Sequence, residues 1–143
     1  MDYHITSAEK RHLDALSALE RECFSVPWTR AQLTAELPDG HHEFLVAESG
    51  DTLLGYVGMM YVLDEGYISN VAVSLAYRRQ GIASALMSAF LRQAKSEGRD
   101  FVLLTCHEAK IGMYEHMGFK ELGLSNSVWG GVPWREMICD VRD

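Results

Sequence analysis

The sequence of 143 residues predicts an α+β fold, in which helices cover both faces of a mixed, mostly antiparallel twisted sheet (three-layer α/β/α). Three strand patterns joined by short glycine-containing connections indicate antiparallel hairpins. A strongly amphipathic helix then leads into a continuous apolar strand, which is typical of a parallel crossover. The length is that of one domain, so residues 1–143 are expected to form a single unit.

The chain is expected to begin with a short strand over Tyr3–Ile5. The segment Thr6–Glu9 has the pattern of a capping box, in which a hydroxyl and a later carboxylate satisfy free amides at a helix start. We therefore predict a helix from this segment to about Cys23.

A second helix is predicted to begin at Thr29, which forms another capping box with Gln32. Trp28 lies just before this cap and can pack against Leu33 as a hydrophobic staple. The segment Pro38–Gly40 is expected to end the helix.

The remaining elements alternate between strand and helix patterns. Strands are expected over residues 44–48, 53–63, 67–73, 101–106, 119–124 and 134–141, and helices over 82–98 and 109–117. The strand at 101–106 is a continuous apolar run, so we expect it to be buried on both faces beside the parallel strand 67–73.

Composition excludes several classes of function. The net charge of −7 argues against nucleic acid as a partner. No apolar run reaches the ~18 to 20 residues that span a bilayer and no signal-peptide pattern is present, so we expect no membrane partner and a cytoplasmic location. Cys23, Cys106 and Cys139 are interpreted as buried thiols rather than a disulfide framework. No set of four close ligands is present, so no metal is expected.

The distribution of charge points to a ligand. Residues 66–96 contain no Asp or Glu and carry Arg78, Arg79, Arg92 and Lys95, a local charge of +4 in an acidic chain. Such a window favours a small polyanion, although a solvated helix face has the same composition.

The segment Tyr77–Ser84 lies between a strand and an amphipathic helix. A helix start offers free backbone amides and the positive end of the helix dipole, so phosphate binds there readily. Gly81 lets an anion approach the backbone, while Arg78 and Arg79 add charge. The pattern is neither of the common nucleotide-binding loops, which argues against ATP, GTP or NAD.

Three segments together resemble the GNAT superfamily of N-acetyltransferases. They are Ser69–Val73 (SNVAV), Tyr77–Ala83 (YRRQGIA) and Tyr114–Phe119 (YEHMGF), and their order and spacing extend the resemblance over nearly the whole chain. The resemblance implies a sheet that splays between its fourth and fifth strands and an acetyl-CoA co-substrate.

The resemblance also implies which residues hold the co-substrate. The backbone of residues 71–73 would pair with the pantetheine arm, and the amides of residues 79–84 would hold the diphosphate. The cofactor-binding residues expected on this basis are Val71, Ala72, Val73, Arg78, Arg79, Gln80, Gly81, Ile82, Ala83 and Ser84.

Acetyl transfer to an amine needs a base for the ammonium, an acid for the departing thiolate and a donor for the developing oxyanion. The resemblance implies that the backbone N–H near Val73 is the oxyanion donor. It also implies that Tyr114 is the general acid, because a phenol with an ordinary pKa near 10 is matched to a thiolate leaving group.

The general base is less clearly marked. The ribosomal-protein-alanine N-acetyltransferases, which the N-terminal half resembles at Cys23–Trp28 and Tyr67–Val73, carry a glutamate on the strand after the crossover helix. The segment Leu103–Glu108 has no glutamate at the matching place. His107 is our predicted base, directly or through water, with Glu108 and Glu65 as alternatives.

The acceptor is expected to be a primary amine, on a protein N-terminus such as ribosomal-protein alanine or on a small molecule. The C-terminal third supports the second class, because residues 123–127, residues 130–134 and Met137 resemble small-amine, arylalkylamine-like acetyltransferases. Phe24 and Trp28 are predicted to contact the acceptor, together with the segment Trp129–Trp134.

Two other interpretations stay open at this stage. Cys106 could carry the acetyl group as a covalent intermediate, although its apolar strand offers little to lower a thiol pKa, so direct attack is preferred. The missing glutamate also fits a non-catalytic acyl-CoA-binding or protein-interaction module with this fold. The C-terminal edge strands are where a homodimer would pair.

Overall fold

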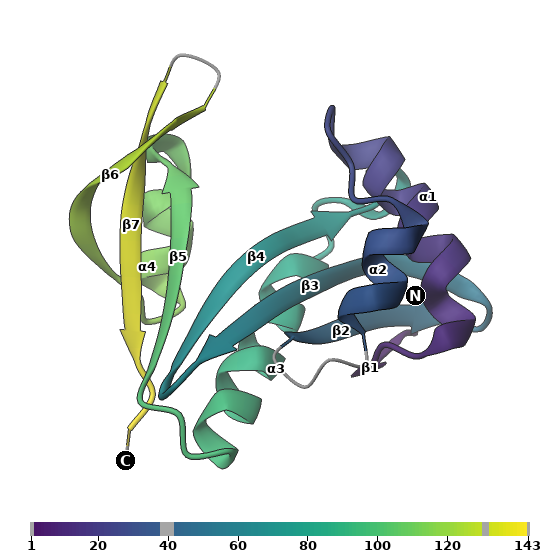
Figure 1. Cartoon of the computed structure of the whole chain (residues 1–143), viewed down its shortest axis with the longest axis horizontal. Coiled ribbons are helices and arrows are strands. Elements are labelled where there is room, and N and C mark those ends of the chain that lie inside the picture. The colour runs from purple at the N-terminus through teal and green to yellow at the C-terminus, as the bar shows by residue number, and fades with distance from the viewer. Residues whose placement is uncertain (1, 38–41, 130–131, 143) are drawn as a thin grey trace. The chain divides into compact units, whose positions relative to one another are not determined.

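The computed structural model describes residues 2–37, 42–129 and 132–142, and it describes side chains for these residues except 125–129 and 132–133. The described helices are α1 (Leu13–Cys23), α2 (Arg30–Glu36), α3 (Ile82–Ser96) and α4 (Ile111–His116), with short 3-10 turns η1 (Lys10–His12), η2 (Leu75–Tyr77) and η3 (Glu108–Lys110). The strands are β1 (His4–Ser7), β2 (His42–Ser49), β3 (Thr52–Val62), β4 (Glu65–Val73), β5 (Phe101–His107), β6 (Lys120–Trp129) and β7 (Val132–Asp140) (Figure 1).

The strands form one seven-stranded sheet in the order β1-β2-β3-β4-β5-β7-β6. The pairs β1·β2, β2·β3, β5·β7 and β6·β7 are antiparallel, and β4·β5 is parallel. The prediction of an α+β fold with a mixed, mostly antiparallel sheet is therefore confirmed.

The chain divides into two compact units, one formed by residues 1–60 and 69–90 and the other by residues 61–68 and 91–143. In the first unit, an apolar cluster joins α1 and α2 to the sheet. Its buried members are Leu13, Leu16, Leu19, Leu33, Phe44, Val46, Tyr56 and Ala72. Trp28 packs against the same cluster as Leu33, as a staple across the α2 cap requires.

The start of α2 is formed as the sequence predicts. The amide of Gln32 donates to Thr29 Oγ1 at 3.1 Å, and the amide of Thr29 donates to Gln32 Oε1 at 2.8 Å. The expected stop at Pro38–Gly40 lies outside the described residues.

The predicted capping box at Thr6–Glu9 is wrong. Thr6 and Ser7 belong to β1, where they pair with Val46 and Leu45 of β2. The helical segment instead begins at η1, with Glu9 as its N-cap in a reciprocal arrangement with His12. Ladder hydrogen bonds with β2 therefore override the local capping preference of the two hydroxyl residues.

A buried carboxylate fixes this N-terminal segment to β2. Glu48 accepts from Arg11 Nη2 at 2.8 Å and lies 2.9 Å from His12 Nε2 and 3.0 Å from His4 Nε2. The hydrogen bond from Arg11, followed by that from His12, lowers the pKa of Glu48 from 4.5 to about 2. Because the group is buried among these partners, it holds β1, η1 and β2 together.

In the second unit, β5 lies between β4 and β7. Its parallel register with β4 covers Glu65–Tyr67 against Phe101–Leu103, the first three residues of each strand. Its antiparallel register with β7 covers the whole of β5. In the described strands, β5 has no ladder pairing with β4 beyond these starts.

The expectation that β5 is buried on both faces is wrong. Val102, Leu104 and Cys106 are buried, but the residues alternating with them are half-exposed. A continuous apolar run thus occupies a strand with one covered face, because β7 is antiparallel to it and both faces need not be covered.

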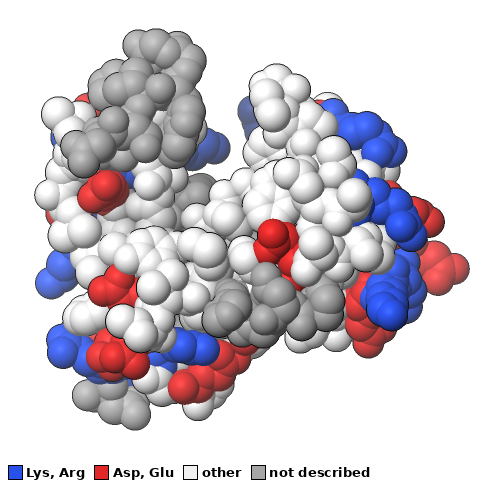
Figure 2. Space-filling model, viewed as in Figure 1, with Lys and Arg blue, Asp and Glu red and all other residues white. Residues whose placement is uncertain are grey.

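Charged side chains of both signs are interspersed over α1 and α2 on the face seen in Figure 2. One exposed pair joins these helices, with Arg30 Nε 2.7 Å from Asp14 Oδ1. Exposed pairs of this kind contribute little to stability, so the apolar cluster dominates the packing of the two helices. Within the part of the chain that the structure describes, no helix is long and apolar enough to cross a membrane.

Candidate functional site

The turn before α3 has an unusual backbone. Arg79 and Gly81 have positive φ angles, 65° and 78°, and α3 begins directly after them at Ile82. The first intrahelical bond at this end runs from the amide of Ala85 to the carbonyl of Gly81, at 3.0 Å. The amides of Ile82, Ala83 and Ser84 therefore precede the first helical bond and have no partner within the helix.

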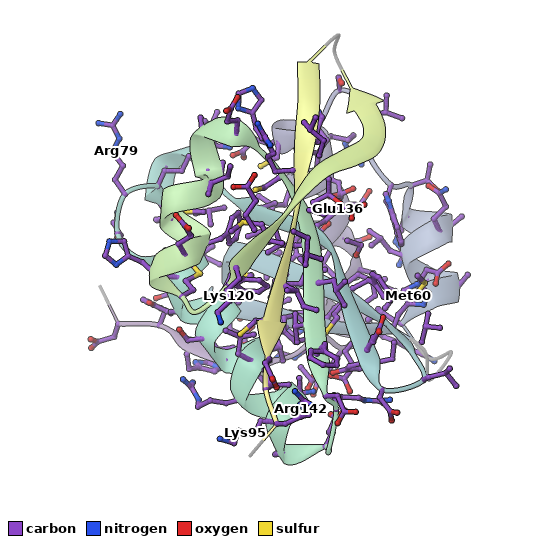
Figure 3. All side chains as sticks on the ribbon, turned by 90° about the vertical axis from the view of Figure 1, so that its left-hand side faces the viewer. Met60, Arg79, Lys95, Lys120, Glu136 and Arg142 are labelled. Carbon is purple, nitrogen blue, oxygen red and sulfur yellow. The ribbon has the colours of Figure 1, made fainter. Side chains whose placement is uncertain are left out.

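This geometry suits an anion. Residues 78–81 are exposed, and a Cβ built on Gly81 would meet nothing within 4 Å. Gly81 is needed for its positive φ angle rather than for space. Figure 3 shows the side chain of Arg79 projecting outward from the turn. Free amides at the start of a 15-residue helix, with two arginines beside them, fit a diphosphate.

The end of β4 is fixed to this turn by Arg78. Its Nε donates to the carbonyl oxygen of Val73 at 3.0 Å, and Cys23 Sγ lies 3.6 Å from the same oxygen. On β3, a Cβ added to Gly55 would lie 2.7 Å from the carbonyl oxygen of Ala72 and 3.3 Å from Val73 Cα. Gly55 therefore allows β3 to approach the backbone of Ala72 and Val73 closely.

The aromatic loop, residues 24–28, belongs to the first unit and packs against its apolar cluster. Phe24 and Trp28 are half-buried against the apolar cluster, and the Trp28 ring meets Phe44 edge to face with centroids 6.4 Å apart. Between them Val26 is 86% exposed. The loop thus presents one apolar side chain to solvent between two anchored aromatic residues.

Tyr114 lies on α4 in the second unit. Its ring meets Phe119 edge to face with centroids 5.9 Å apart. Burial, followed by the nearby Cys106, raises the pKa of its phenol above the ordinary 10.0. The group therefore keeps its proton at neutral pH and can donate it.

His107 ends β5 and caps η3. The amide of Ala109 donates to His107 Nδ1 at 3.1 Å, and the ring meets Trp134 edge to face at 6.0 Å. In the neutral side chain this bond places the ring proton on Nε2 and the lone pair on Nδ1. To accept a proton at Nε2, His107 must change tautomer and release the amide of Ala109.

The two alternative bases also have partners. Glu108 Oε1 lies 3.5 Å from Arg135 Nη2, and Arg135 is held more closely by Glu121 at 3.0 Å. Glu65 Oε2 accepts from the hydroxyl of Tyr67 at 2.5 Å. Of these interactions, the one to Glu108 is the longest and therefore the easiest to exchange for a ligand.

The cysteines differ from one another in exposure. Cys106 and Cys139 are buried as predicted, whereas Cys23 is half-exposed beside Val73 and Arg78, so that expectation is wrong for Cys23. Burial raises the pKa of the Cys106 thiol, which disfavours a nucleophilic thiolate. In the described residues no group of three or more His, Cys, Asp or Glu side chains could hold a metal ion.

Sequence reasoning missed Glu20, which is fully buried in the first unit. Glu20 Oε1 accepts from the amide of Trp28 at 2.7 Å, and Oε2 accepts from the hydroxyl of Tyr56 at 2.5 Å. A signal was present, because Glu20 follows Leu16 by four residues and so lies on the apolar face of α1. A charged residue on a buried helix face has to be paired.

Comparisons with known proteins agree on one family. The profile of the acetyltransferase (GNAT) family matches residues 13–119. The chain is 25% identical over 135 residues to the [ribosomal protein bS18]-alanine N-acetyltransferase of Escherichia coli K12, covering 92% of this chain and 90% of that protein. This likeness extends over most of the chain and not only its N-terminal half.

Two solved structures share the fold. The ribosomal-protein-S18-alanine N-acetyltransferase from Escherichia coli superposes with a TM-score of 0.87 at 21% identity, covering 99% of this chain and 96% of that one. The PaiA N-acetyltransferase from Thermoplasma acidophilum, solved with coenzyme A, gives 0.82 at 17% identity, covering 98% and 99%. The expected likeness of the C-terminal third to small-amine enzymes stays a prediction, and its residues 130 and 131 lie outside the described chain.

Proposed function

Because the chain belongs to the GNAT family and is an acetyl-CoA-dependent N-acetyltransferase, we propose that it acetylates the primary amine of a protein N-terminus by direct attack on acetyl-CoA. The likeness to an alanine N-acetyltransferase over nine-tenths of both chains supports this class of acceptor. Residues 1–143 would act as a single catalytic domain.

The observation that carries the proposal is the turn from Arg78 to Ser84. Its positive φ angles at Arg79 and Gly81 and its free amides at the start of α3 are what a coenzyme A diphosphate requires. Residues Val71–Val73 would pair with the pantetheine arm through their backbone. Gln80 and Ser84 would contribute amides, together with the residues between them.

The proposed chemistry assigns one role to each group. The amine nitrogen forms a bond to the acetyl carbon as the bond from that carbon to sulfur breaks. Val73 N–H donates to the developing oxyanion, and Tyr114 gives its phenolic proton to the departing thiolate. Its raised pKa keeps that proton available at neutral pH.

His107 is our proposed base. Its Nε2 would accept the proton of the acceptor ammonium, in the tautomer that carries a proton on Nδ1, or His107 would act through a water molecule. The loss of one capping bond, from the amide of Ala109, costs about 1 kcal/mol, which a base can tolerate. Glu108 is the alternative because its ion pair with Arg135 is long.

For the acceptor, we propose contacts with the aromatic loop. Phe24 and Trp28 form the anchored sides of the loop, and exposed Val26 lies between them. A small primary amine is the second candidate acceptor. The segment Trp129–Trp134 is a further proposed contact, of which residues 130 and 131 and the side chains of 129, 132 and 133 lie outside the description.

The proposal is tested by calorimetry with CoA, comparing Arg79→Glu with Arg92→Glu. Both variants reverse a charge in the basic window, but only Arg79 belongs to the turn. We expect Arg79→Glu to weaken CoA binding about tenfold or more, and Arg92→Glu to change it little. Equal effects of the two variants would contradict a specific diphosphate site at residues 78–84.

The sequence also leaves open a non-catalytic acyl-CoA-binding module, because β5 lacks the glutamate that the family resemblance leads us to expect, and the match to the acetyltransferase family favours the enzyme. An acceptor panel separates the two functions. It contains an alanine-starting peptide, arylalkylamines and polyamines, and release of CoA is measured with each. Binding of acetyl-CoA without turnover on any of them would favour the binding module.

A further inference from the structure

The last turn of α1 contacts two segments of the first unit that the proposed function uses. On one side Glu20 bonds to the aromatic loop. On the other, Glu22 bonds to the chain that follows β4 and Cys23 bonds to the last residue of β4. These contacts come from three of the last four residues of the helix. We propose that this turn positions both substrate segments, with Glu20 setting the acceptor side and Glu22 the acetyl-CoA side.

On the acceptor side, the contact is to the backbone. The amide of Trp28 donates to Glu20 Oε1 at 2.7 Å, which fixes the end of the aromatic loop just before the α2 cap. Glu20 is fully buried, so water does not compete for this bond. The carboxylate therefore sets where the loop leaves α1 and enters α2.

Glu20 is itself held by the sheet. Its second oxygen accepts from the hydroxyl of Tyr56 on β3 at 2.5 Å, and that hydroxyl accepts from Asn70 Nδ2 on β4 at 3.2 Å. Burial, followed by the bond to Glu20, raises the pKa of Tyr56, so its hydroxyl keeps donating. A continuous chain of hydrogen bonds thus runs from β4 to the aromatic loop, and Glu20 accepts from both sides of it.

On the co-substrate side, the contacts are to residues 73–75. Glu22 Oε2 accepts from the amide of Leu75 at 2.7 Å, and Glu22 Oε1 lies 3.4 Å from Ser74 Oγ. Cys23 Sγ lies 3.6 Å from the carbonyl oxygen of Val73, which Arg78 also bonds. These bonds hold the segment between the proposed pantetheine strand and the proposed diphosphate turn.

The two carboxylates differ in surroundings, and this makes the inference testable. Glu20 is buried, whereas the bonds of Glu22 lie at an exposed site. Glu20→Gln keeps the side-chain size but loses one acceptor oxygen, so it cannot accept both existing bonds. Glu22→Ala removes the acceptor for the Leu75 amide and retains a good helix former in the last turn of α1.

The experiment is steady-state kinetics with calorimetry, and it rests on the proposed function only for its acceptor arm. We expect Glu20→Gln to raise the acceptor KM roughly tenfold while the acetyl-CoA Kd changes less than about twofold. Glu22→Ala should raise the acetyl-CoA Kd roughly threefold to fivefold and leave the acceptor KM unchanged. If both variants change the same constant by the same factor, the inference is wrong.

Tyr56→Phe distinguishes positioning from core stability. It removes the bond to Glu20 Oε2 but leaves the one from the Trp28 amide. Because it frees one oxygen of Glu20 but leaves the acceptor of the Trp28 amide, we expect it to lower the thermal midpoint at least as much as Glu20→Gln does and to raise the acceptor KM clearly less than Glu20→Gln does. An equal rise of KM in both variants would mean that Glu20 is only a core residue.

Hydrogen exchange tests the acceptor side without turnover. In the wild-type protein, the Trp28 amide should exchange roughly 100-fold more slowly than that of Val26, which lies at the exposed tip of the same loop. Similar rates would overturn the role of Glu20, even if Glu20→Gln does not fold. A protein that shows this protection and binds CoA but transfers no acetyl group would refute the proposed function and leave the inference standing.

Discussion

Two segments carry the proposed function, one through its backbone and the other through its side chains. Residues 71–84 are proposed to bind acetyl-CoA, and residues 107–114 are proposed to supply the acid and the base. The first offers backbone: free amides at the start of α3, a strand end and two positive φ angles. The second offers side chains: the phenol of Tyr114 and the imidazole of His107. Each is described within its own unit.

The difference explains why the co-substrate is easier to infer than the base. A backbone site needs small residues and a particular turn, which leave a recognisable local pattern such as Arg78–Ala83. A side-chain base needs one lone pair in one place, and many residues can supply it. The two segments should therefore respond differently to substitution, in affinity on one side and in turnover on the other.

The largest expected effect is that of Tyr114→Phe. The variant loses the proposed proton donor but keeps the ring that packs on Phe119, so kcat should fall about 100-fold with the acetyl-CoA Kd unchanged. In the wild type, the raised pKa of Tyr114 predicts no loss of kcat through its deprotonation below about pH 10. Unchanged turnover in the variant would remove Tyr114 from the mechanism.

Gly55→Ala tests the segment proposed to bind acetyl-CoA. The added Cβ would lie 2.7 Å from the backbone oxygen of Ala72, so β4 has to shift at the residues proposed to pair with pantetheine. We expect acetyl-CoA binding to weaken roughly tenfold, the lower end of the effect of overpacking. Gly58→Ala is the matched control, because its Cβ would meet the Phe44 ring and Ser69 Oγ instead. It should lose stability with little change in that affinity.

An effect of similar size, on turnover rather than affinity, is expected for the base. His107→Gln keeps a side chain that can cap η3 but cannot take up a proton, so kcat/KM should fall about tenfold near neutral pH. If Glu108→Gln lowers kcat/KM by this factor and His107→Gln leaves it unchanged, then Glu108 is the base.

The smallest effect on catalysis is expected from Glu48, which belongs to neither segment. Because its pKa falls from 4.5 unfolded to about 2 folded, its carboxylate stabilises the fold above pH 4.5, and this contribution is lost as the pH falls toward 2. Denaturant unfolding of Glu48→Gln should therefore show a shallower loss of stability over that range.

Asp140→Asn is the control for Glu48→Gln. Asp140 also has a pKa of about 2, from its bonds to Arg142, but that pair is exposed at the surface. Screening by water makes such pairs weak, so Asp140→Asn should leave the acid profile nearly unchanged. If the two variants lose stability equally as the pH falls, burial of Glu48 does not contribute to the pH dependence of folding stability.

The elements of the fold follow from the sequence wherever one physical signal dominates. Periodicity fixed α3, and the Thr29–Gln32 pair fixed the start of α2, because neither competes with another preference. The capping box predicted at Thr6 was wrong because hydroxyl residues occur both in capping motifs and in edge strands, and Thr6 and Ser7 lie in an edge strand. The prediction that both faces of β5 are buried was wrong because an apolar run does not show whether one face of the strand is covered or both.

The site was predictable to the extent that it is local. The proposed diphosphate turn and Tyr114 lie in short motifs, so the sequence alone suggests both. The network of Glu20, Tyr56 and Asn70 joins residues up to 50 positions apart, and only the fold brings them together. Its single trace in the sequence was a glutamate on an apolar helix face.

Arg79 holds a left-handed backbone conformation, with a φ angle of 65°, that costs an ordinary residue roughly 1 kcal/mol and a glycine almost nothing. The free protein is therefore less stable at this turn than a glycine would make it. Glycine would be the most stable residue at this backbone conformation, yet the position carries the guanidinium group of Arg79. In the proposed function the bound diphosphate offsets this cost, so saturating coenzyme A should raise the midpoint of thermal unfolding.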